Sequence, residues 1–410
     1  MTLSIDEDRM RETFEKYSAI GATENGGLHR LTLSDADVEA REEFISDVEA
    51  LGLDVEIDEV GNIFGYREGA TDEAAVMIGS HLDSQPMGGR YDGQLGVLTA
   101  LETLRTLDDA DLVTDRPLII VDWTNEEGAR YKPAMLGSGV YAGEIDLNRA
   151  LSAEDDDGIT LGSELERTGY DGSSSPDPDD VHAFLELHVE QGPQLVGTDD
   201  TVGIVEGVLG MAWLEVTVEG QSDHAGPSPV HDRKDPMMAA AAAMDRIGTM
   251  PNRLSADART TIGRVSSEPD SVNVIPSMVT FTVDIRSFED ATIDRGIELI
   301  ESELETACKR HGTTYDIDQL WRISNVEFSE TVQTAIAHAV DDTGIPGRPI
   351  LSGAGHDACY VNSVIDTGMM FVPSVGGISH SEDEFTEWED CLAGAEVYAN
   401  AVDELASLDD

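Results

Sequence analysis

The chain has 410 residues, more than one ordinary hydrophobic core accommodates, so two domains are expected. It carries 83 Asp and Glu residues against 25 Lys and Arg residues, a formal net charge of -58. A charge of this sign repels nucleic-acid phosphates and anionic lipids, which argues against nucleic-acid and membrane partners.

The first part of the chain alternates between helical and strand patterns. An acidic helix is expected near the N-terminus and a second helix over residues 34–51. Residues 75–80 (AVMIGS) and 117–123 (PLIIVDW) are apolar runs typical of buried strands, and residues 95–107 form a helical pattern after a glycine-rich turn. This alternation predicts an α/β sheet with helices on its faces.

Two later stretches belong with this first sheet. Residues 152–180 are acidic and rich in turn residues, so we expect a surface excursion before a buried strand at 183–187. After about residue 324 the chain returns to a helical pattern and a buried strand over 369–373, which completes the first domain.

The pattern of apolar and polar residues changes near residue 210. Apolar and polar residues alternate over 214–219 and again over 279–285, as in strands that have one face in solvent. Helices are expected over 236–247 and 293–310, with a last strand over 315–321. Strands of this kind suit an antiparallel sheet with helices on one side.

The predicted fold class is therefore α/β, with a mixed sheet that carries helices on both faces. This domain is expected to comprise residues 1–210 and 325–410. Residues 211–324 are expected to form an inserted α+β domain that acts as a lid or a dimerisation domain.

Polar side chains follow the first predicted strand directly. His81 and Asp83 lie two positions apart in GSHLDSQPMGGRYDG, so both point to one face of an extended chain. An imidazole with a nearby carboxylate suits metal binding, and Asp92 lies in a glycine-flanked turn that can bring its carboxylate close to a cation. A polar loop that merely opens a helix is the alternative for this motif alone.

A pair of adjacent acids follows the second predicted strand. Glu126 and Glu127 in TNEEGARYKPAMLGSG repel each other unless a cation neutralises one of them. Glu127 as a metal ligand would leave Glu126 as a general base. A solvated acid pair is the alternative, but His188 in ELHVEQGP and His380 in GGISHSEDE also follow strand-like runs, which favours a metal centre.

The ten histidines fall into two groups by their sequence context. Five histidines stand in glycine-rich or acid-rich motifs: His81, His188, His380, His224 (SDHAGPSP) and His356 (SGAGHDA). A structural role is an alternative for His224 and His356. The remaining five are expected to be structural or surface residues: His29, His182, His231, His311 and His338.

The acidic surface predicts adaptation to molar salt, as in an extreme halophile. At about 1 M salt the Debye length falls to roughly 3 Å, which screens most of the repulsion between surface charges. The acids are scattered along the whole chain, which disfavours an acidic disordered tail. Lysine is rare, with Lys16, Lys132, Lys234 and Lys309 standing among many arginines.

The compartment expected from the sequence is the cytoplasm. There is no run of about 18 apolar residues, and MTLSIDEDRM has acids where a signal peptide has basic and apolar residues. The three cysteines, Cys308, Cys359 and Cys391, form no CxxC motif and are predicted to be buried cysteines rather than disulfides or zinc ligands.

Seven motifs along nearly the whole chain occur together in one order: GSHLDSQPMGGRYDG, TNEEGARYKPAMLGSG, ELHVEQGP, DHAGPSP, residues 273–286, SGAGHDA and PSVGGISH. In this order they resemble the hydantoinase/carbamoylase amidase family. That family includes N-carbamoyl-L-amino-acid hydrolases, beta-ureidopropionases and allantoate amidohydrolases, and it is related to aminoacylase-type metallopeptidases. The order is far more specific than any single motif.

The resemblance implies that the first domain is a bimetal hydrolase domain with two divalent ions, zinc above all, with manganese, cobalt or nickel as alternatives. By this likeness His81 and His188 hold one ion and Glu127 and His380 the other, while Asp92 bridges them. Glu126 is then the base. Asp83 does not bind an ion itself but lies next to the residues that do.

The same resemblance implies a set of substrate contacts. Arg286 offers a planar fork that binds a carboxylate in two places, and His224 and Asn273 come with it from the inserted domain. Gln191 and His356, together with His224, are expected at the carbamoyl end or the oxyanion. A structural ion pair is the alternative for Arg286.

The expected activity is metal-dependent hydrolysis of a linear amide in N-carbamoyl-L-amino acids, giving an amino acid, ammonia and carbon dioxide. Allantoate, ureidoglycine or beta-ureidopropionate hydrolysis and an aminoacylase-like activity are alternatives with the same ligands. A non-catalytic metal-dependent binding protein is an alternative of another class. A homodimer is expected from the resemblance and from the free edge of the second sheet.

Overall fold

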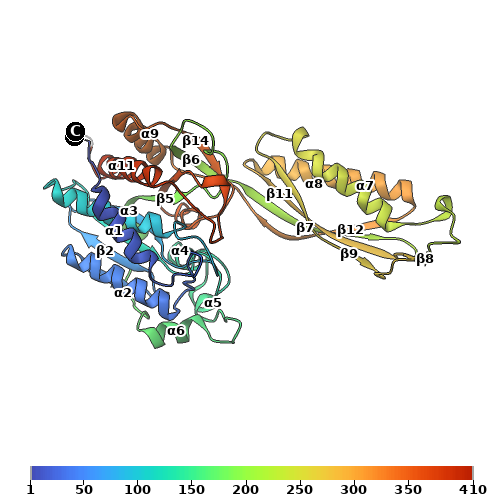
Figure 1. Cartoon of the computed structure of the whole chain (residues 1–410), viewed down its shortest axis with the longest axis horizontal. Helices are drawn as coiled ribbons and strands as arrows, with labels where there is room; N and C mark the ends of the chain where they lie inside the picture. Colours follow the sequence, from blue (N-terminus) through green and yellow to red (C-terminus); the bar gives the residue numbers. More distant parts are fainter. Residues whose placement is uncertain (1, 409–410) are drawn as a thin grey trace. The chain divides into compact units, whose positions relative to one another are not determined.

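The computed structural model describes residues 2–408, which form two compact units (Figure 1). Unit 2 comprises Gly207–Val326, and unit 1 comprises the described chain on either side of it. Each unit has its own hydrophobic core. No helix among the described residues is both long and apolar enough to cross a membrane.

Unit 1 is built on a nine-stranded sheet with the order β1-β2-β4-β3-β5-β15-β6-β13, in which β14 also pairs with β6. The strands are β1 (Asp54–Ile57), β2 (Ile63–Arg67), β3 (Ala75–His81), β4 (Leu118–Trp123), β5 (Val181–Val189), β6 (Val202–Val208), β13 (Val326–Glu327), β14 (Gly347–Ser352) and β15 (Asp366–Val372). The central strands β4, β3, β5 and β15 are parallel, whereas β2 and β6 are antiparallel to their neighbours. The sheet is thus mixed, as predicted.

Helices cover both faces of this sheet. The helices of unit 1 are α1 (Glu7–Ser18), α2 (Asp35–Ala50), α3 (Gln94–Asp109), α4 (Leu136–Tyr141), α5 (Leu147–Leu151), α6 (Leu161–Thr168), α9 (Glu330–Thr343), α10 (Asp357–Val361) and α11 (Trp388–Leu405). On one face α3 packs on β3 and β5, and α11 packs on β5 and β15. On the other face the ring of Tyr141 in α4 lies 5.3 Å from that of Trp123. Every residue of β3 and β4 is buried for this reason, which explains their continuous apolar runs.

The acidic stretch before β5 contains more regular structure than predicted. Residues 161–168 form α6, and Pro178–Asp180 form a short 3-10 helix. The side chain of Thr160 accepts a hydrogen bond from the backbone N–H of Ser163 and so caps α6, while Leu161 and Leu165 are buried in the core. Two apolar residues four positions apart were too weak a pattern to predict this helix.

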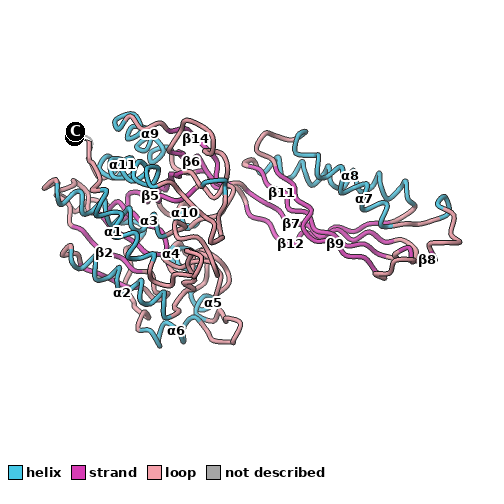
Figure 2. Tube along the Cα trace, in the orientation of Figure 1, coloured by secondary structure: helices cyan, strands magenta, loops and turns pink. Residues whose placement is uncertain are grey.

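Unit 2 contains a four-stranded antiparallel sheet in the order β12-β7-β11-β9. Its elements are β7 (Gly210–Glu219), β9 (Arg259–Glu268), β11 (Met278–Ser287), β12 (Thr314–Ile323), α7 (Pro236–Thr249), α8 (Asp290–His311) and a small pair, β8 (Asp223–His224) and β10 (Val274–Ile275). The helices α7 and α8 lie side by side along the sheet (Figure 2). The prediction missed β9, an edge strand whose residues are largely exposed and therefore show no strong alternation.

The alternation in unit 2 follows from its single covered face. Val216 of β7 and Phe281 of β11 are fully buried and pack in one cluster with Ala240 of α7 and Ile300 of α8. The intervening residues of both strands are half-buried or exposed. A sheet with helices on one side only thus accounts for the period of two in the sequence.

The three cysteines are free. Cys308 and Cys391 are buried as predicted, whereas Cys359 is half-buried.

A buried ion pair lies beneath the sheet of unit 1. Arg41 of α2 and Asp37 have no exposed side-chain surface, and the Nε of Arg41 donates to the Oδ2 of Asp37 at 2.7 Å. The guanidinium also donates to the carbonyl oxygen of Gly61 at 2.7 Å and to the Oγ1 of Thr124 at 3.1 Å. Charges removed from water are tolerated only when such partners are present.

Replacing Arg41 with Met is expected to lower the free energy of unfolding by about 3–5 kcal/mol, because the Asp37 carboxylate would stay buried without its cation. Urea unfolding followed by circular dichroism in molar KCl measures the change. The control is Arg295→Met, because the Arg295–Glu298 pair, at 2.6 Å, is exposed and such pairs contribute less than about 1 kcal/mol. A loss no larger than the control's would contradict the role of the buried pair.

Candidate metal centre

The predicted ligands gather at one edge of the unit 1 sheet. Because β4, β3, β5 and β15 are parallel, their carboxyl ends meet at the same edge. The side chains concerned are His81 at the end of β3, Glu126 and Glu127 just after β4, His188 near the end of β5, His380 in the loop after β15, and Asp92 in the loop between β3 and α3. Strand order thus brings together residues that lie far apart in the sequence.

Asp92 presents one carboxylate oxygen to two histidines. Its Oδ1 lies 3.6 Å from the Nε2 of His81 and 3.1 Å from the Nε2 of His188. All three side chains are almost fully buried, and their ligand atoms lie within 4.8 Å of one another. This group can hold one metal ion.

The other oxygen of Asp92 faces a second group. Its Oδ2 lies 3.6 Å from the Nε2 of His380, and the Oε2 of Glu127 lies 3.5 Å from the same nitrogen. His380 is 52% exposed, so this side of the centre is the more open one. Asp92 therefore has one oxygen toward each group, the arrangement expected of a carboxylate that bridges two ions.

The two buried histidines are oriented by backbone carbonyls. The Nδ1 of His81 lies 3.0 Å from the carbonyl oxygen of Asp83, and the Nδ1 of His188 lies 2.9 Å from that of Val189. With the proton on Nδ1, each ring donates this hydrogen bond and turns the lone pair of Nε2 toward Asp92. Each ring is thus oriented by its own neighbourhood in the sequence.

The residues present fit divalent metal ions. Among the described side chains, the Nε2 of His81 is buried and has no hydrogen-bond partner. Imidazole and carboxylate donors in this combination suit Zn, Mn, Co or Ni. Burial, reinforced by the charge of Asp92, raises the pKa of Glu127 to about 8, because a nearby like charge disfavours the charged form of a buried carboxyl group. An ion between the two groups would relieve that repulsion.

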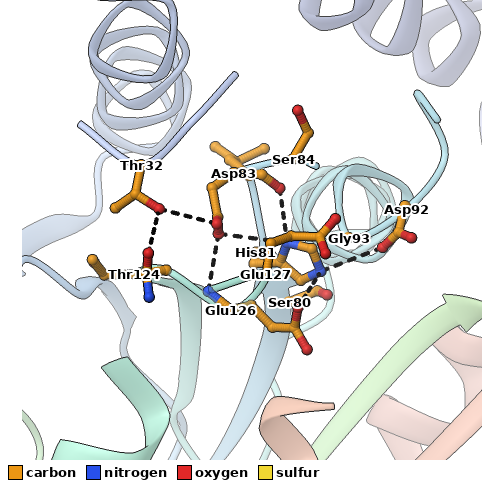
Figure 3. Close-up of polar contacts among 12 residues, drawn as sticks. Thr32, Ser80, His81, Asp83, Ser84, Asp92, Gly93, Thr124, Glu126 and Glu127 are labelled. Carbon is orange, nitrogen blue, oxygen red and sulfur yellow. Dashed lines mark hydrogen bonds and ion pairs between the residues drawn. The ribbon is translucent and has the colours of Figure 1, made fainter. Parts of the chain in front are cut away.

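Asp83 lies behind the centre, although its carboxylate does not hydrogen-bond the ring of His81. The Oδ1 of Asp83 is 3.7 Å from the Nδ1 of His81 and instead accepts a hydrogen bond from the backbone N–H of Glu126 at 3.1 Å. Its Oδ2 accepts from the hydroxyl of Thr32 at 3.0 Å. Asp83 thus links the end of β3 to the acid pair after β4 (Figure 3).

Glu126 lies beside the ligands without belonging to either group. Its Oε2 is 3.7 Å from the Nε2 of His81, and the residue is 8% exposed. Figure 3 shows the side chain of His81 lying among those of Asp83, Asp92 and Glu126. Burial raises the pKa of Glu126 well above that of an exposed glutamate, and the charges of Asp357 and Glu127 add to this. This carboxylate is placed to accept a proton at the centre.

Two glutamines hydrogen-bond the two carboxylates that are candidate metal ligands. Gln191, predicted to contact substrate, donates from its Nε2 to the Oδ2 of Asp92 at 2.7 Å. Gln85 was not predicted as a site residue; its backbone N–H and its Nε2 donate to the two carboxylate oxygens of Glu127 at 3.0 and 2.8 Å. The HxDSQ spacing is the sequence signal that could have indicated Gln85, because it places an amide just beyond the strand end.

His356 lies behind His188. The two rings have centroids 4.6 Å apart and meet edge to face, and His356 is 2% exposed. Burial lowers the pKa of His356 well below that of an exposed histidine, and the neighbouring His188 lowers it further. Both effects favour the uncharged form of the ring. The predicted contact of His356 with substrate stays a prediction.

The remaining predicted site residues lie in unit 2. His224 in β8 pairs with Val274 of β10, and Asn273 accepts a hydrogen bond at its carbonyl oxygen from the N–H of Ala225 at 3.0 Å. Arg286 in β11 donates from Nε and Nη2 to the two carboxylate oxygens of Asp284 at 3.0 and 2.9 Å. The guanidinium thus already binds a carboxylate through the fork that was predicted to bind substrate.

Comparison with known proteins identifies the family. Residues 77–404 match peptidase family M20/M25/M40. The chain is 38% identical over 405 residues to an N-carbamoyl-L-amino-acid amidohydrolase of Rhizobium meliloti, covering 98% of this chain and 97% of the relative. It is 31% identical over 395 residues to an allantoate amidohydrolase of Bacillus subtilis, covering 96% of each. A solved structure of a hydantoinase/carbamoylase family amidase from Burkholderia ambifaria is similar with a TM-score of 0.94 and 39% identity over 100% of both chains.

The chain therefore belongs to peptidase family M20/M25/M40. Within it, the chain is a member of the hydantoinase/carbamoylase amidases and is an amidohydrolase, which confirms the family predicted from the motifs.

Proposed function

We propose that this amidohydrolase cleaves the linear amide of N-carbamoyl-L-amino acids to an amino acid, ammonia and carbon dioxide. The observation that carries the proposal is the geometry of Asp92, whose two oxygens face two different ligand groups beside the buried carboxylate of Glu126. The substrate class is supported by the amidohydrolase of Rhizobium meliloti, similar over nearly the full length of both chains.

In the proposed centre His81 and His188 would hold one ion, Glu127 and His380 would hold the other, and Asp92 would contact both. Two divalent ions there would polarise the scissile carbonyl and lower the pKa of a bound water toward neutrality. Asp83 orients the backbone at Glu126 through the hydrogen bond to its N–H.

Glu126 would accept the proton of the attacking water at its Oε2 and deliver it to the leaving nitrogen. Its low exposure keeps bulk water from competing for this proton. The contacts predicted for Gln191, His224, Asn273, Arg286 and His356 would orient the substrate. For Arg286 this means that a substrate carboxylate exchanges with that of Asp284.

Allantoate is the second candidate substrate, because the allantoate amidohydrolase of Bacillus subtilis is 31% identical to the chain. Like an N-carbamoyl amino acid, allantoate contains a ureido group and a carboxylate, so the same ligands and base would serve both reactions. The two candidates differ in the groups around the carboxylate, which only a direct comparison of substrates distinguishes.

The test is ammonia release from N-carbamoyl-L-amino acids, allantoate, beta-ureidopropionate and N-acetyl amino acids. The protein is first freed of metal by a chelator. It is then assayed in molar KCl after Zn, Mn, Co or Ni has been restored. We expect the highest kcat/KM with an N-carbamoyl-L-amino acid, and none before metal is restored. The highest value with allantoate would replace the first candidate by the second, and turnover by the metal-free protein would contradict the metal centre itself.

A further inference from the structure

Glu384 is a buried carboxylate beside the proposed centre that belongs to neither ligand group. It lies four residues after His380, and it is 4% exposed. Its Oε1 accepts hydrogen bonds from the backbone N–H groups of Tyr91 and Asp92, at 3.2 and 3.1 Å. One oxygen of Glu384 therefore holds the backbone of the residue proposed to contact both ions.

The second oxygen of Glu384 holds the loop that carries His380. Its Oε2 accepts a hydrogen bond from the hydroxyl of Ser379 at 2.8 Å. The same hydroxyl oxygen lies 3.2 Å from the Oδ2 of Asp92, so it can donate to either carboxylate. Glu384, Ser379 and Asp92 thus form one network between two loops that lie far apart in the sequence.

The surroundings of Glu384 leave little room for another arrangement. A Cβ atom at Gly89 would lie 2.0 Å from the Oε1 of Glu384, so the carboxylate fills space that only a glycine leaves open. The next residue, Phe385, packs its ring against that of Tyr91 with centroids 5.9 Å apart. The two loops are therefore joined by both polar and apolar contacts on either side of the carboxylate.

The ligands differ in how they are held. His81 and His188 are each oriented by a backbone carbonyl close by in the sequence. His380 lies in a loop, half exposed, in the left-handed backbone region with φ of 53°. Such a backbone conformation is unfavourable for a residue with a side chain and persists only where the surroundings enforce it. The hydrogen bonds of the preceding residue, Ser379, to Glu384 and Asp92 restrain the backbone beside His380.

We infer that Glu384 is a positioning residue that fixes the loop of His380 against Asp92 and thereby supports metal binding at the Asp92/Glu127/His380 group more than at the His81/Asp92/His188 group. The inference rests on the two-ion centre of the proposed function. Residues that orient metal ligands in this way typically change metal affinity by about 10–100-fold when they are replaced. A carboxylate with a merely structural role would instead alter stability and leave the relative affinities of the two ions unchanged.

The experiment compares Glu384→Ala and Glu384→Gln with the unaltered chain. Metal-free protein is titrated with Co²⁺ in molar KCl, and bound ions per chain are counted by elemental analysis while the visible spectrum reports each site. We expect two ions in the unaltered chain. In Glu384→Ala the second ion, at the Asp92/Glu127/His380 group, should bind about 10–100-fold more weakly. The first ion, at the His81/Asp92/His188 group, should lose less affinity, because only Asp92 among its three ligands is held by Glu384.

Glu384→Gln separates positioning from charge. The amide oxygen can still accept from the N–H groups of Tyr91 and Asp92, and the amide nitrogen can donate to Ser379, so the second affinity should return to within a few-fold of the unaltered value. Equally weak binding in the Gln and Ala variants would show that the negative charge alone matters and would overturn the inference.

Asp257→Ala is the matched control. Asp257 in unit 2 likewise accepts from a serine hydroxyl and a backbone N–H, those of Ser287 and Phe288, at 2.7 and 2.6 Å. Both ions should bind normally in this variant. If Glu384→Ala does not fold, Ser379→Ala takes its place, because it removes only the hydroxyl and should weaken the second ion by a smaller factor.

The outcomes distinguish the two hypotheses. Fewer than two ions in the unaltered chain would contradict the two-ion centre and with it the proposed function. The other outcome is that the unaltered chain binds two ions and that both affinities are unchanged, or equally reduced, in Glu384→Ala and Ser379→Ala. That result would overturn the role of Glu384 and leave the proposed function intact.

Discussion

Glu126→Gln is expected to lower kcat by about 10²–10⁴-fold, the usual contribution of a positioned general base, while both metal ions stay bound. Glu126 lies 3.7 Å from the Nε2 of His81 but belongs to neither ligand group. Glutamine has nearly the same shape and cannot accept a proton at neutral pH. The change should therefore remove proton transfer and preserve the ligands.

The measurement is steady-state ammonia release together with the number of bound ions per chain. Glu102→Gln is the control, because Glu102 is also a buried carboxylate but pairs with Arg9 in the helical layer, at 2.7 Å. That variant should keep kcat within a few-fold of the unaltered value. An unchanged kcat in Glu126→Gln would assign the base elsewhere, and a loss of metal would make Glu126 a ligand.

Transfer from about 3 M to 0.1 M KCl is expected to lower the melting temperature by about 10 °C or more and to abolish activity. The physical reason is the formal net charge of -58. Two exposed carboxylates 10 Å apart repel by about 0.4 kcal/mol in water, and at 0.1 M salt the Debye length is still about 10 Å. Summed over many pairs, this repulsion approaches the roughly 5–15 kcal/mol that stabilises a folded domain.

Unfolding relieves that repulsion because it spreads the charges apart, so screening stabilises the folded state. Each kcal/mol is worth about 2–4 °C in a chain of several hundred residues, and several kcal/mol give the expected shift. Circular-dichroism melts at both KCl concentrations test it, with sucrose at low salt as the control for an effect of solute alone. Equal melting temperatures at 0.1 and 3 M KCl would refute the adaptation to molar salt.

Much of the fold could be predicted because local patterns carry it. The strands β3 and β4 are buried on both faces, so each needs an unbroken apolar run, and both were predicted within a residue. The strands β7 and β11 have one covered face and alternate accordingly. By contrast, the edge strand β9 and the short helix α6 were missed, because an exposed strand and a two-residue apolar stripe resemble loops.

The sequence by itself determined the family, the mixed sheet and the candidate ligands. The ligands could be predicted because parallel strands place the residues that follow their carboxyl ends at one edge of the sheet. Only the tertiary structure decided which atoms meet. It placed one oxygen of Asp92 toward each ligand group, turned the Asp83 carboxylate to the N–H of Glu126, and buried Glu384 between two loops. These contacts join segments far apart in the chain, and the pattern of one segment contains no information about the partner it will meet.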